Sequence, residues 1–391
     1  MTKARLAVAL VAAILALAAP HRTLAADTLE IPTILPMTGP AAFLGKEYAD
    51  TLKLLEERLN KTGGVAGRQI HFAIVDDQTS PQIDVQLTTA ALQKKVPLII
   101  DGAPLALCRA TAPLMPNGPV MWCLSPSMVP TPGSYVMAVM APSRDSIVAG
   151  LNYFRGRGFK KLGVLDSTDA TGADTDASIV ELMKLPAYAG MSVVAMEHFN
   201  IADLSVAAQI SRIKAGGAQA MFGFTTGTPV ATILRGMADG GLDIPVFTSQ
   251  GNMSIAQLDS YKAFMPKELL FPGYAALAPD SVGDAGVREK VAAFRADMKA
   301  AGLSPDLLHA TPWDPVFLIQ ETFKRAGANA TAEQLRAALG GIRNWPGVFG
   351  RYDFPASPNR GLGVNWIIIS KWSPSTSTWV AVSSGGGGPI K

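Results

Sequence analysis

The chain has 391 residues, of which 48% are hydrophobic and 17% charged, with 34 lysines and arginines against 31 aspartates and glutamates. Three of the bases and none of the acids lie in the first 26 residues, so the remainder is formally neutral, with 31 of each. A neutral chain offers no basic face to nucleic acid or to an anionic membrane, and we expect neither as a partner. Residues 27–391 are too many for one ordinary core and predict two domains.

The N-terminus has the order of features found in a secretory signal peptide. Lys3 and Arg5 precede an apolar run over residues 6–19, and a small-residue site ends at Ala26. The run is shorter than the roughly 20 residues that a membrane-spanning helix needs. We therefore expect cleavage after Ala26, with an N-terminal core helix as the alternative. No cysteine adjoins the site, so we expect a periplasmic protein that begins at Asp27 and has no lipid anchor there.

Strands and helices alternate along the first part of the mature chain. Strands are predicted over residues 29–35, 70–75, 96–100 and 119–124. A helix is predicted over residues 46–60 because apolar side chains recur at helical spacing there, at Tyr48, Leu52, Leu55 and Leu59. Ser80 and Pro81 are suited to begin the next helix as N-cap and first helical residue. Short buried strands alternating with helices predict a parallel sheet with helices on both faces.

The same pattern then repeats at an offset of roughly 120 residues. Predicted strands over residues 192–198, 220–224 and 244–248 match those near 70–75, 98–101 and 118–122. A twofold repeat of an α/β unit predicts two similar lobes with a cleft between them. It does not fit a solenoid, whose repeats are about 20 to 50 residues long.

The segments after about residue 272 do not restart this pattern and are interpreted as elements shared between the lobes. Helices are predicted near residues 284–301, 315–326 and 332–339, followed by strands near 352–354 and 364–372. We expect an N-terminal lobe of residues 27–142 plus 273–345 and a C-terminal lobe of residues 143–272 plus 346–384. The tail over residues 385–391 begins with four glycines and is expected to be disordered.

The chain has two cysteines, Cys108 and Cys123, which are fifteen residues apart. In an oxidising compartment two such thiols can form a disulfide. They can equally be two buried apolar side chains. Both alternatives stay open at the level of the sequence.

Catalytic and metal-binding interpretations find no support in the motifs. The chain contains no G-x-S-x-G, H-E-x-x-H or G-x-x-x-x-G-K sequence. His71, His198 and His309 lie far apart without metal-ligand spacing. Asp76 and Asp77 can be a carboxylate pair, but the end of a strand leading to a helix start is the preferred interpretation. We expect neither an enzyme nor a bound cofactor or metal.

An ordered set of short motifs resembles the type I periplasmic binding proteins, and more narrowly the branched-chain amino-acid receptors of ABC transporters. The motifs are Leu35 to Pro40, Gly45, Asn60 to Gly67, Asp76 to Gln78, Gly102, Ser125-Pro126, Gly172, Leu234-Arg235 and Trp313-Asp314. The resemblance covers nearly the whole mature chain. It implies two doubly wound parallel-sheet lobes joined by three crossovers, closing on a ligand by a hinge motion. It also implies a permease partner with two ATPase subunits and no enzymatic activity, and we expect a monomer.

Ligands of open α/β sheets bind beyond the carboxyl ends of the strands, and this rule and the resemblance together give the candidate site. The candidates are Phe43, Leu44, Leu105, Ala106, Ser127, Met128, Thr171, Thr226, Gln250, Gly251 and Trp313. By similarity, Ala106 occupies the place of a serine that meets the ligand head group, and Trp313 lies near an aromatic position of the pocket. Arg109 and Arg144 are further candidates as partners of a ligand carboxylate.

Two departures from the family pattern bear on the ligand. The amino-acid receptors place a glutamate against the ligand ammonium where this chain has Gln250, and Ala106 lacks the serine hydroxyl. An unpaired buried ammonium costs several kcal/mol, so we expect a small organic acid, preferably an aromatic carboxylate. An amino-acid ligand for the same kind of importer, or a ligand-sensing role in signalling, is the alternative.

Overall fold

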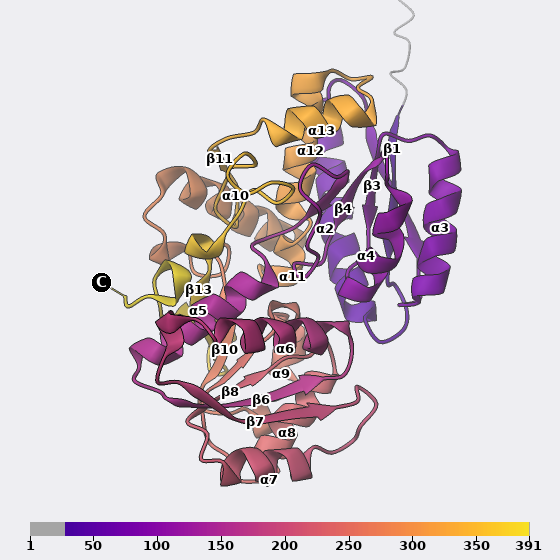
Figure 1. Ribbon diagram of the computed structural model, residues 1–391. Coiled ribbons are helices and arrows are strands. Elements are labelled where there is room, and N and C mark those ends of the chain that lie inside the picture. The colour runs from indigo at the N-terminus through magenta and orange to yellow at the C-terminus, as the bar shows by residue number, and fades with distance from the viewer. Residues whose placement is uncertain (1–27, 391) are drawn as a thin grey trace, which may run out of the picture.

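The computed structural model describes residues 28–390, and the first lobe is built on a five-stranded parallel sheet (Figure 1). In chain order its strands are β1 (Leu29–Leu35), β2 (Ile70–Asp76), β3 (Leu98–Asp101), β4 (Val120–Cys123) and β5 (Val136–Ala138). Their order in the sheet is β2-β1-β3-β4-β5, and every pair is parallel. The expected signal peptide and Asp27 lie outside the described residues.

Helices on both faces cover this sheet. The helices of this lobe are α2 (Ala42–Lys61), α3 (Pro81–Gln93), α4 (Leu105–Thr111), α10 (Ala285–Ala301), α11 (Leu307–Ala310), α12 (Trp313–Ala326) and α13 (Ala332–Gly340), of which α10 and α11 pack outside the layer that covers the sheet. The predicted apolar stripe of α2 is buried, because Tyr48, Leu52, Leu55 and Leu59 are all at most 3% exposed. Ser80 caps α3 as predicted, and its hydroxyl accepts from the N–H of Ile83.

The second lobe is built on a seven-stranded sheet of the order β14-β13-β10-β9-β8-β6-β7. Its strands are β6 (Lys161–Ser167), β7 (Ser192–Phe199), β8 (Ala220–Gly223), β9 (Val246–Thr248), β10 (Leu269–Gly273), β13 (Ile368–Ser373) and β14 (Thr378–Ala381). The first five run parallel, and β13 is antiparallel to both β10 and β14. The helices are α5 (Ser143–Gly156), α6 (Ala170–Leu182), α7 (Ala207–Ala215), α8 (Pro229–Asp239) and α9 (Ile255–Asp259).

Short elements complete the fold. The two-residue strands β11 (Trp345–Pro346) and β12 (Arg351–Tyr352) form a hairpin. The 3-10 helices are η1 (Ala112–Leu114), η2 (Pro186–Tyr188), η3 (Gln250–Asn252), η4 (Lys262–Phe264), η5 (Pro279–Ser281), η6 (Val364–Trp366) and η7 (Gly385–Gly387). Within residues 28–390, no helix has both the length and the apolar character needed to cross a membrane. The predicted fold class, two parallel-sheet α/β lobes, is confirmed.

The chain passes between the lobes three times, after β5, after β10 and before β13. The third passage comes later than the change expected after residue 345. The carboxylate of Asp314 at the start of α12 accepts from the N–H groups of Val348 and Phe349. Further on, the side chain of Asn359 donates to the carbonyl of Val136 in β5. The buried carboxylate of Asp314 needs these donors, and the Asn359 hydrogen bond reaches a strand of the first lobe. The chain therefore stays with the first lobe to about residue 360.

The C-terminal glycines are ordered in place of the expected disorder. Residues 385–387 form η7, and the side chain of Asn152 in α5 donates to the carbonyl of Gly386 at 3.0 Å. A Cβ at Gly387 would lie 2.0 Å from the carbonyl oxygen of Ala149. The absence of side chains lets this segment approach the backbone of α5 closely.

A disulfide joins Cys108 in α4 to Cys123 at the end of β4, with 5.8 Å between their Cα atoms. Both sulfur-bearing residues are fully buried. The bond links helix α4 to the end of β4, so it lies beside the loops after β3 and β4, which are expected to meet a ligand.

Candidate functional site

The loops after β1, β3 and β4 in the first lobe face the loops after β6, β8 and β9 in the second. We call the region where they meet the interlobe seam. Figure 1 shows α4 and α6 on its two sides, with α11 between the lobes. The carboxyl ends of parallel strands are where open α/β folds bind ligands. The seam is therefore where we expect a ligand to bind.

Phe43, in the first turn of α2, reaches the second lobe. Its ring lies so close to Gly227, in the loop after β8, that a Cβ there would be 2.8 Å from the ring. Gly227 also has a φ of +89°, and both features favour glycine at this position. The predicted residue Thr226 is the neighbour of Gly227. The structure thus brings Phe43 and the Thr226 loop together across the seam.

A second contact across the seam surrounds the disulfide. Leu105 and Met128 pack with Cys108 and Cys123 in a small apolar cluster of the first lobe. Ala170, from the first turn of α6 in the second lobe, packs against this cluster. Leu105 is 1% exposed and Met128 9% exposed, so both are mainly packing residues in this closed arrangement.

The polar candidates near this contact have partners of their own. The hydroxyl of Ser127 lies 2.6 Å from that of Ser143, the first residue of α5. Thr171 is half-buried, and its N–H donates to the capping carboxylate of Asp169 at the start of α6. Ala106 is exposed in the first turn of α4.

The loop after β9 carries Gln250, which is only 2% exposed. Its amide nitrogen Nε2 has no hydrogen-bond partner among the described residues. Gly251 packs against Thr226, because a Cβ on it would lie 2.9 Å from the Thr226 methyl group. Asn252 joins the two loops by donating to the carbonyl of Thr225 and accepting from the N–H of Gly227. Gln250 and Thr226 are therefore held side by side, with the Gln250 N–H groups unpaired.

Two predicted residues lie in the core of the first lobe and away from these loops. Leu44 is 2% exposed within the main core cluster. Trp313 is 3% exposed and contacts the rings of Phe294 in α10 and Phe317 in α12. The guanidinium of Arg58 lies 5.6 Å from the Trp313 ring. Trp313 packs helices together, because its position at the start of α12 faces α10.

Each of the two candidate arginines forms an ion pair with an acidic side chain. Arg109 in α4 forms an ion pair with Asp174 in α6, at 3.5 Å and across the seam. Arg144 pairs with Glu181 within the second lobe at 3.0 Å. The Arg109–Asp174 pair is thus a contact between the lobes. Burial raises the pKa of the Asp174 carboxyl, and the charges of Arg109 and Arg360 oppose this increase.

Arg360 is a residue of the third crossover that the sequence did not single out. It is 3% exposed, and its guanidinium donates to the carbonyls of Val139, Met140 and Met128. Val139 and Met140 belong to the first crossover, and Met140 has a φ of +54°, which non-glycine residues seldom adopt. Burial lowers the pKa of Arg360 to about 10. Arg360 ties two crossovers to the loop that carries Ser127.

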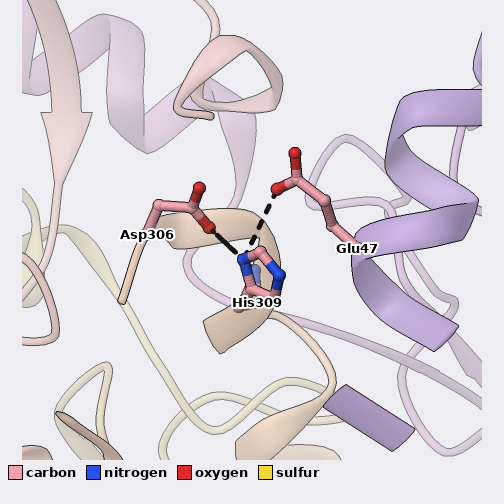
Figure 2. Close-up of side chains that lie close together, drawn as sticks. All are labelled: Glu47, Asp306 and His309. Atoms are coloured by element: carbon pink, nitrogen blue, oxygen red, sulfur yellow. Dashed lines mark hydrogen bonds and ion pairs between the residues drawn. The ribbon is translucent and has the colours of Figure 1, made fainter. Parts of the chain in front are cut away.

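A group of titratable side chains, two buried and one half-buried, also lies at the seam (Figure 2). Glu47 comes from α2, while Asp306 and His309 come from the N-cap and third residue of α11. The imidazole Nδ1 of His309 lies 2.8 Å from Asp306 and 3.6 Å from Glu47. The hydroxyl of Ser254, from the second lobe, donates to Glu47 at 2.7 Å. Because Glu47 lies about 260 residues before the other two in the chain, no local sequence motif could predict this group.

Comparison with known proteins identifies the fold and the family. The sequence profile of the family described as periplasmic binding protein matches residues 28–371. The leucine-, isoleucine-, valine-, threonine- and alanine-binding protein of Pseudomonas aeruginosa is 24% identical over 234 residues. That match spans 59% of this chain and 62% of the relative, which is less than two thirds of the relative's length.

Two solved structures are similar over nearly their whole length. An extracellular ligand-binding receptor from Rhodopseudomonas palustris HaA2 superposes with a TM-score of 0.78 at 18% identity, covering 90% of this chain and 99% of the receptor. An ABC transporter solute-binding protein from Rhodopseudomonas palustris BisB5, in complex with 3,4-dihydroxybenzoic acid, gives 0.73 at 22% identity and covers 91% and 96%. At such identities these structures show a shared fold. Because the family profile spans most of the chain, the protein belongs to the periplasmic binding protein family.

Proposed function

We propose that the protein is the solute receptor of an ABC importer and binds a small organic acid, preferably an aromatic carboxylate, between its lobes. It binds without catalysis, acts in the periplasm after removal of residues 1–26, and delivers its ligand as a monomer to a membrane permease with two ATPase subunits. Family membership and the closed contacts between the two lobes support a receptor that encloses a small molecule.

The proposed class of ligand is inferred from the unpaired side-chain amide of Gln250. Its buried amide offers N–H groups that no described residue accepts, and buried donors ordinarily have a partner. A ligand carboxylate supplies an acceptor there. The hydroxyl of Thr225, which is also buried and has no partner among the described residues, lies two residues beyond the end of strand β8. A neutral amide cannot offset the charge of a buried ammonium.

The relatives divide between two ligand classes. One solved structure of the same fold contains 3,4-dihydroxybenzoic acid, while the Pseudomonas aeruginosa relative is named for branched-chain and small amino acids. Binding of leucine, isoleucine or valine is therefore the second candidate function. Phe43, which is half-buried at the seam, suits a ring or an aliphatic chain alike, so the polar group at position 250 decides between the two.

Replacing Gln250 by glutamate is expected to weaken binding of a benzoate-like acid at least tenfold, or by about 1.4 kcal/mol, because two carboxylates then face each other. Binding is measured by thermal shift across benzoate, 3,4-dihydroxybenzoate and the branched-chain amino acids. Gln93→Glu, an exposed position in α3, makes the same change away from the seam and should leave binding unaltered. Tighter binding of acids by the Gln250→Glu variant would contradict the proposal.

A further inference from the structure

Glu47 and Asp306 hold the loop after β9 in the second lobe against the first lobe through a short set of hydrogen bonds. Directly after η3, the hydroxyl of Ser254 donates to Glu47, and the N–H of Ile255 donates to Asp306 at 3.1 Å. Met253 accepts from the N–H of Leu307. Residues 253–255 continue the loop that carries Gln250. The position of Gln250 is thus coupled to two carboxylates of the first lobe.

The charges around Glu47 are unbalanced. The charges of the acids Asp306 and Asp50 raise its pKa, and the charge of the base His309 lowers it. Burial, followed by the charge of Asp306, raises the pKa of Glu47 to about 7, although the Ser254 hydrogen bond and His309 oppose the increase. Burial acts to lower the pKa of His309, but its hydrogen bond to Asp306 and the charges of Asp306, Glu47 and Asp50 raise it overall. Burial raises the pKa of the neighbouring Tyr48 above its ordinary value.

These groups are better described as a proton-sharing network than as a cation site. One atom from each of Glu47, Asp306 and His309 lies within 4.8 Å of the others. However, Asp306 already accepts from three N–H groups: those of Ile255, the His309 backbone and the His309 ring. A cation would have to displace these hydrogen bonds. Only one oxygen of Glu47, Oε2, accepts no hydrogen bond, and it is the atom that faces the imidazole (Figure 2).

We propose that Glu47, with Asp306 and His309, is a positioning group for the Gln250 loop and makes lobe closure, and therefore ligand affinity, dependent on pH. The proposal rests on one part of the proposed function, namely that ligand binding closes the lobes. When the second lobe covers Glu47, it removes water from a carboxyl group that faces two other acids. The closed form therefore holds the Glu47 proton more tightly than the open form does.

The sign follows from this difference. A carboxyl whose pKa is raised by closure stabilises the closed form fully at low pH, and this contribution is lost as the pH rises through about 7. Affinity is therefore expected to fall by at least about threefold between pH 6 and pH 8, since a difference of one pKa unit corresponds to a factor of ten. Benzoate remains an anion and leucine a zwitterion over this range, so the change belongs to the protein.

Glu47→Gln is the decisive variant, because glutamine keeps the acceptor for Ser254 and imitates the protonated acid. Dissociation constants of the mature protein and of Glu47→Gln are measured by calorimetry at pH 6, 7 and 8. The probe is whichever of benzoate, 3,4-dihydroxybenzoate and leucine binds the unmodified protein most tightly. Glu57→Gln, on the exposed face of the same helix, is the matched control.

The proposal predicts a threefold or larger loss of affinity with pH in the unmodified protein and in Glu57→Gln, and less than a twofold change in Glu47→Gln. Equal pH profiles in all three proteins, or a uniform loss of affinity in Glu47→Gln, would overturn it. Micromolar Zn²⁺ binding that Glu47→Gln abolishes would also overturn it in favour of a metal site. If leucine is the best probe, the aromatic-acid function fails while this test stands. If no probe binds, small-angle scattering tests closure itself: the radius of gyration should increase from pH 6 to pH 8 in the unmodified protein and stay constant in Glu47→Gln, and equal profiles would overturn the proposal.

Discussion

Arg360→Met is expected to lower the free energy of unfolding by about 3 kcal/mol or more, because each buried carbonyl left without its donor costs about 1 to 3 kcal/mol. The substitution leaves the buried carbonyls of Val139, Met140 and Met128 without the guanidinium that donates to them. It also removes a hydrogen bond that holds Met140 in its left-handed backbone conformation. Urea unfolding followed by circular dichroism measures the effect.

Two further variants distinguish the contribution of the planar Arg360 guanidinium from that of its charge. Arg360→Lys keeps the charge but cannot reach several carbonyls with a rigid planar group, so it should recover only part of the loss. Arg343→Met removes an arginine that is 68% exposed, with Asp353 at 3.9 Å, and should change stability by less than about 0.5 kcal/mol. An Arg360→Met protein as stable as the Arg343→Met control would refute the assigned role.

Asp84→Asn is expected to raise the stability of the protein above neutral pH. Asp84 in α3, Asp101 in β3 and Asp77 are all fully buried, and neither carboxyl oxygen of Asp84 has a described hydrogen-bond donor. Burial, together with the charge of Asp101, raises the pKa of Asp84 well above its ordinary value. The folded protein therefore keeps a proton on Asp84, which that carboxyl can donate to Asp101.

The sign of the pH dependence follows from that retained proton. The contribution of this proton to the free energy of unfolding is complete below the ordinary aspartate pKa. It decreases as the pH rises through the neutral range, by up to about 1.4 kcal/mol per pH unit. Asparagine supplies the N–H donor at every pH, so Asp84→Asn should be more stable than the unmodified protein at pH 8 by about 2 kcal/mol or more. Melting temperatures at pH 5 and pH 8 measure this. Asp239→Asn, at an exposed position, is the control, and a loss of stability at pH 8 in Asp84→Asn would contradict the account.

Features that depend on local periodicity could be predicted from the sequence. The apolar stripe of α2, the Ser80 cap and the twofold α/β repeat each arise from neighbouring residues, and each is present. The carboxyl ends of the strands also identified loops that meet across the seam, among them those of Phe43, Met128 and Gln250. Such rules need only strand direction and order.

Features that depend on long-range packing could not be predicted in this way. Trp313 was assigned by position relative to a family, yet which face of α12 it occupies depends on the packing of α10. Arg360 acts on carbonyls more than 200 residues earlier in the chain, and a lone arginine in a loop gives no sign of that. The glycine tail has a composition typical of disorder, but without side chains it packs closely on the backbone of α5.

Calorimetric titration of the mature protein with benzoate, 3,4-dihydroxybenzoate and leucine tests the central claim most directly. The unpaired amide of Gln250 and the absence of a carboxylate at that position favour an anionic ligand without an ammonium group. The account predicts that an aromatic acid binds with a dissociation constant in the micromolar range or below, or about −8 kcal/mol, and that leucine binds at least a hundredfold more weakly. Micromolar binding of leucine with no binding of either acid would contradict it.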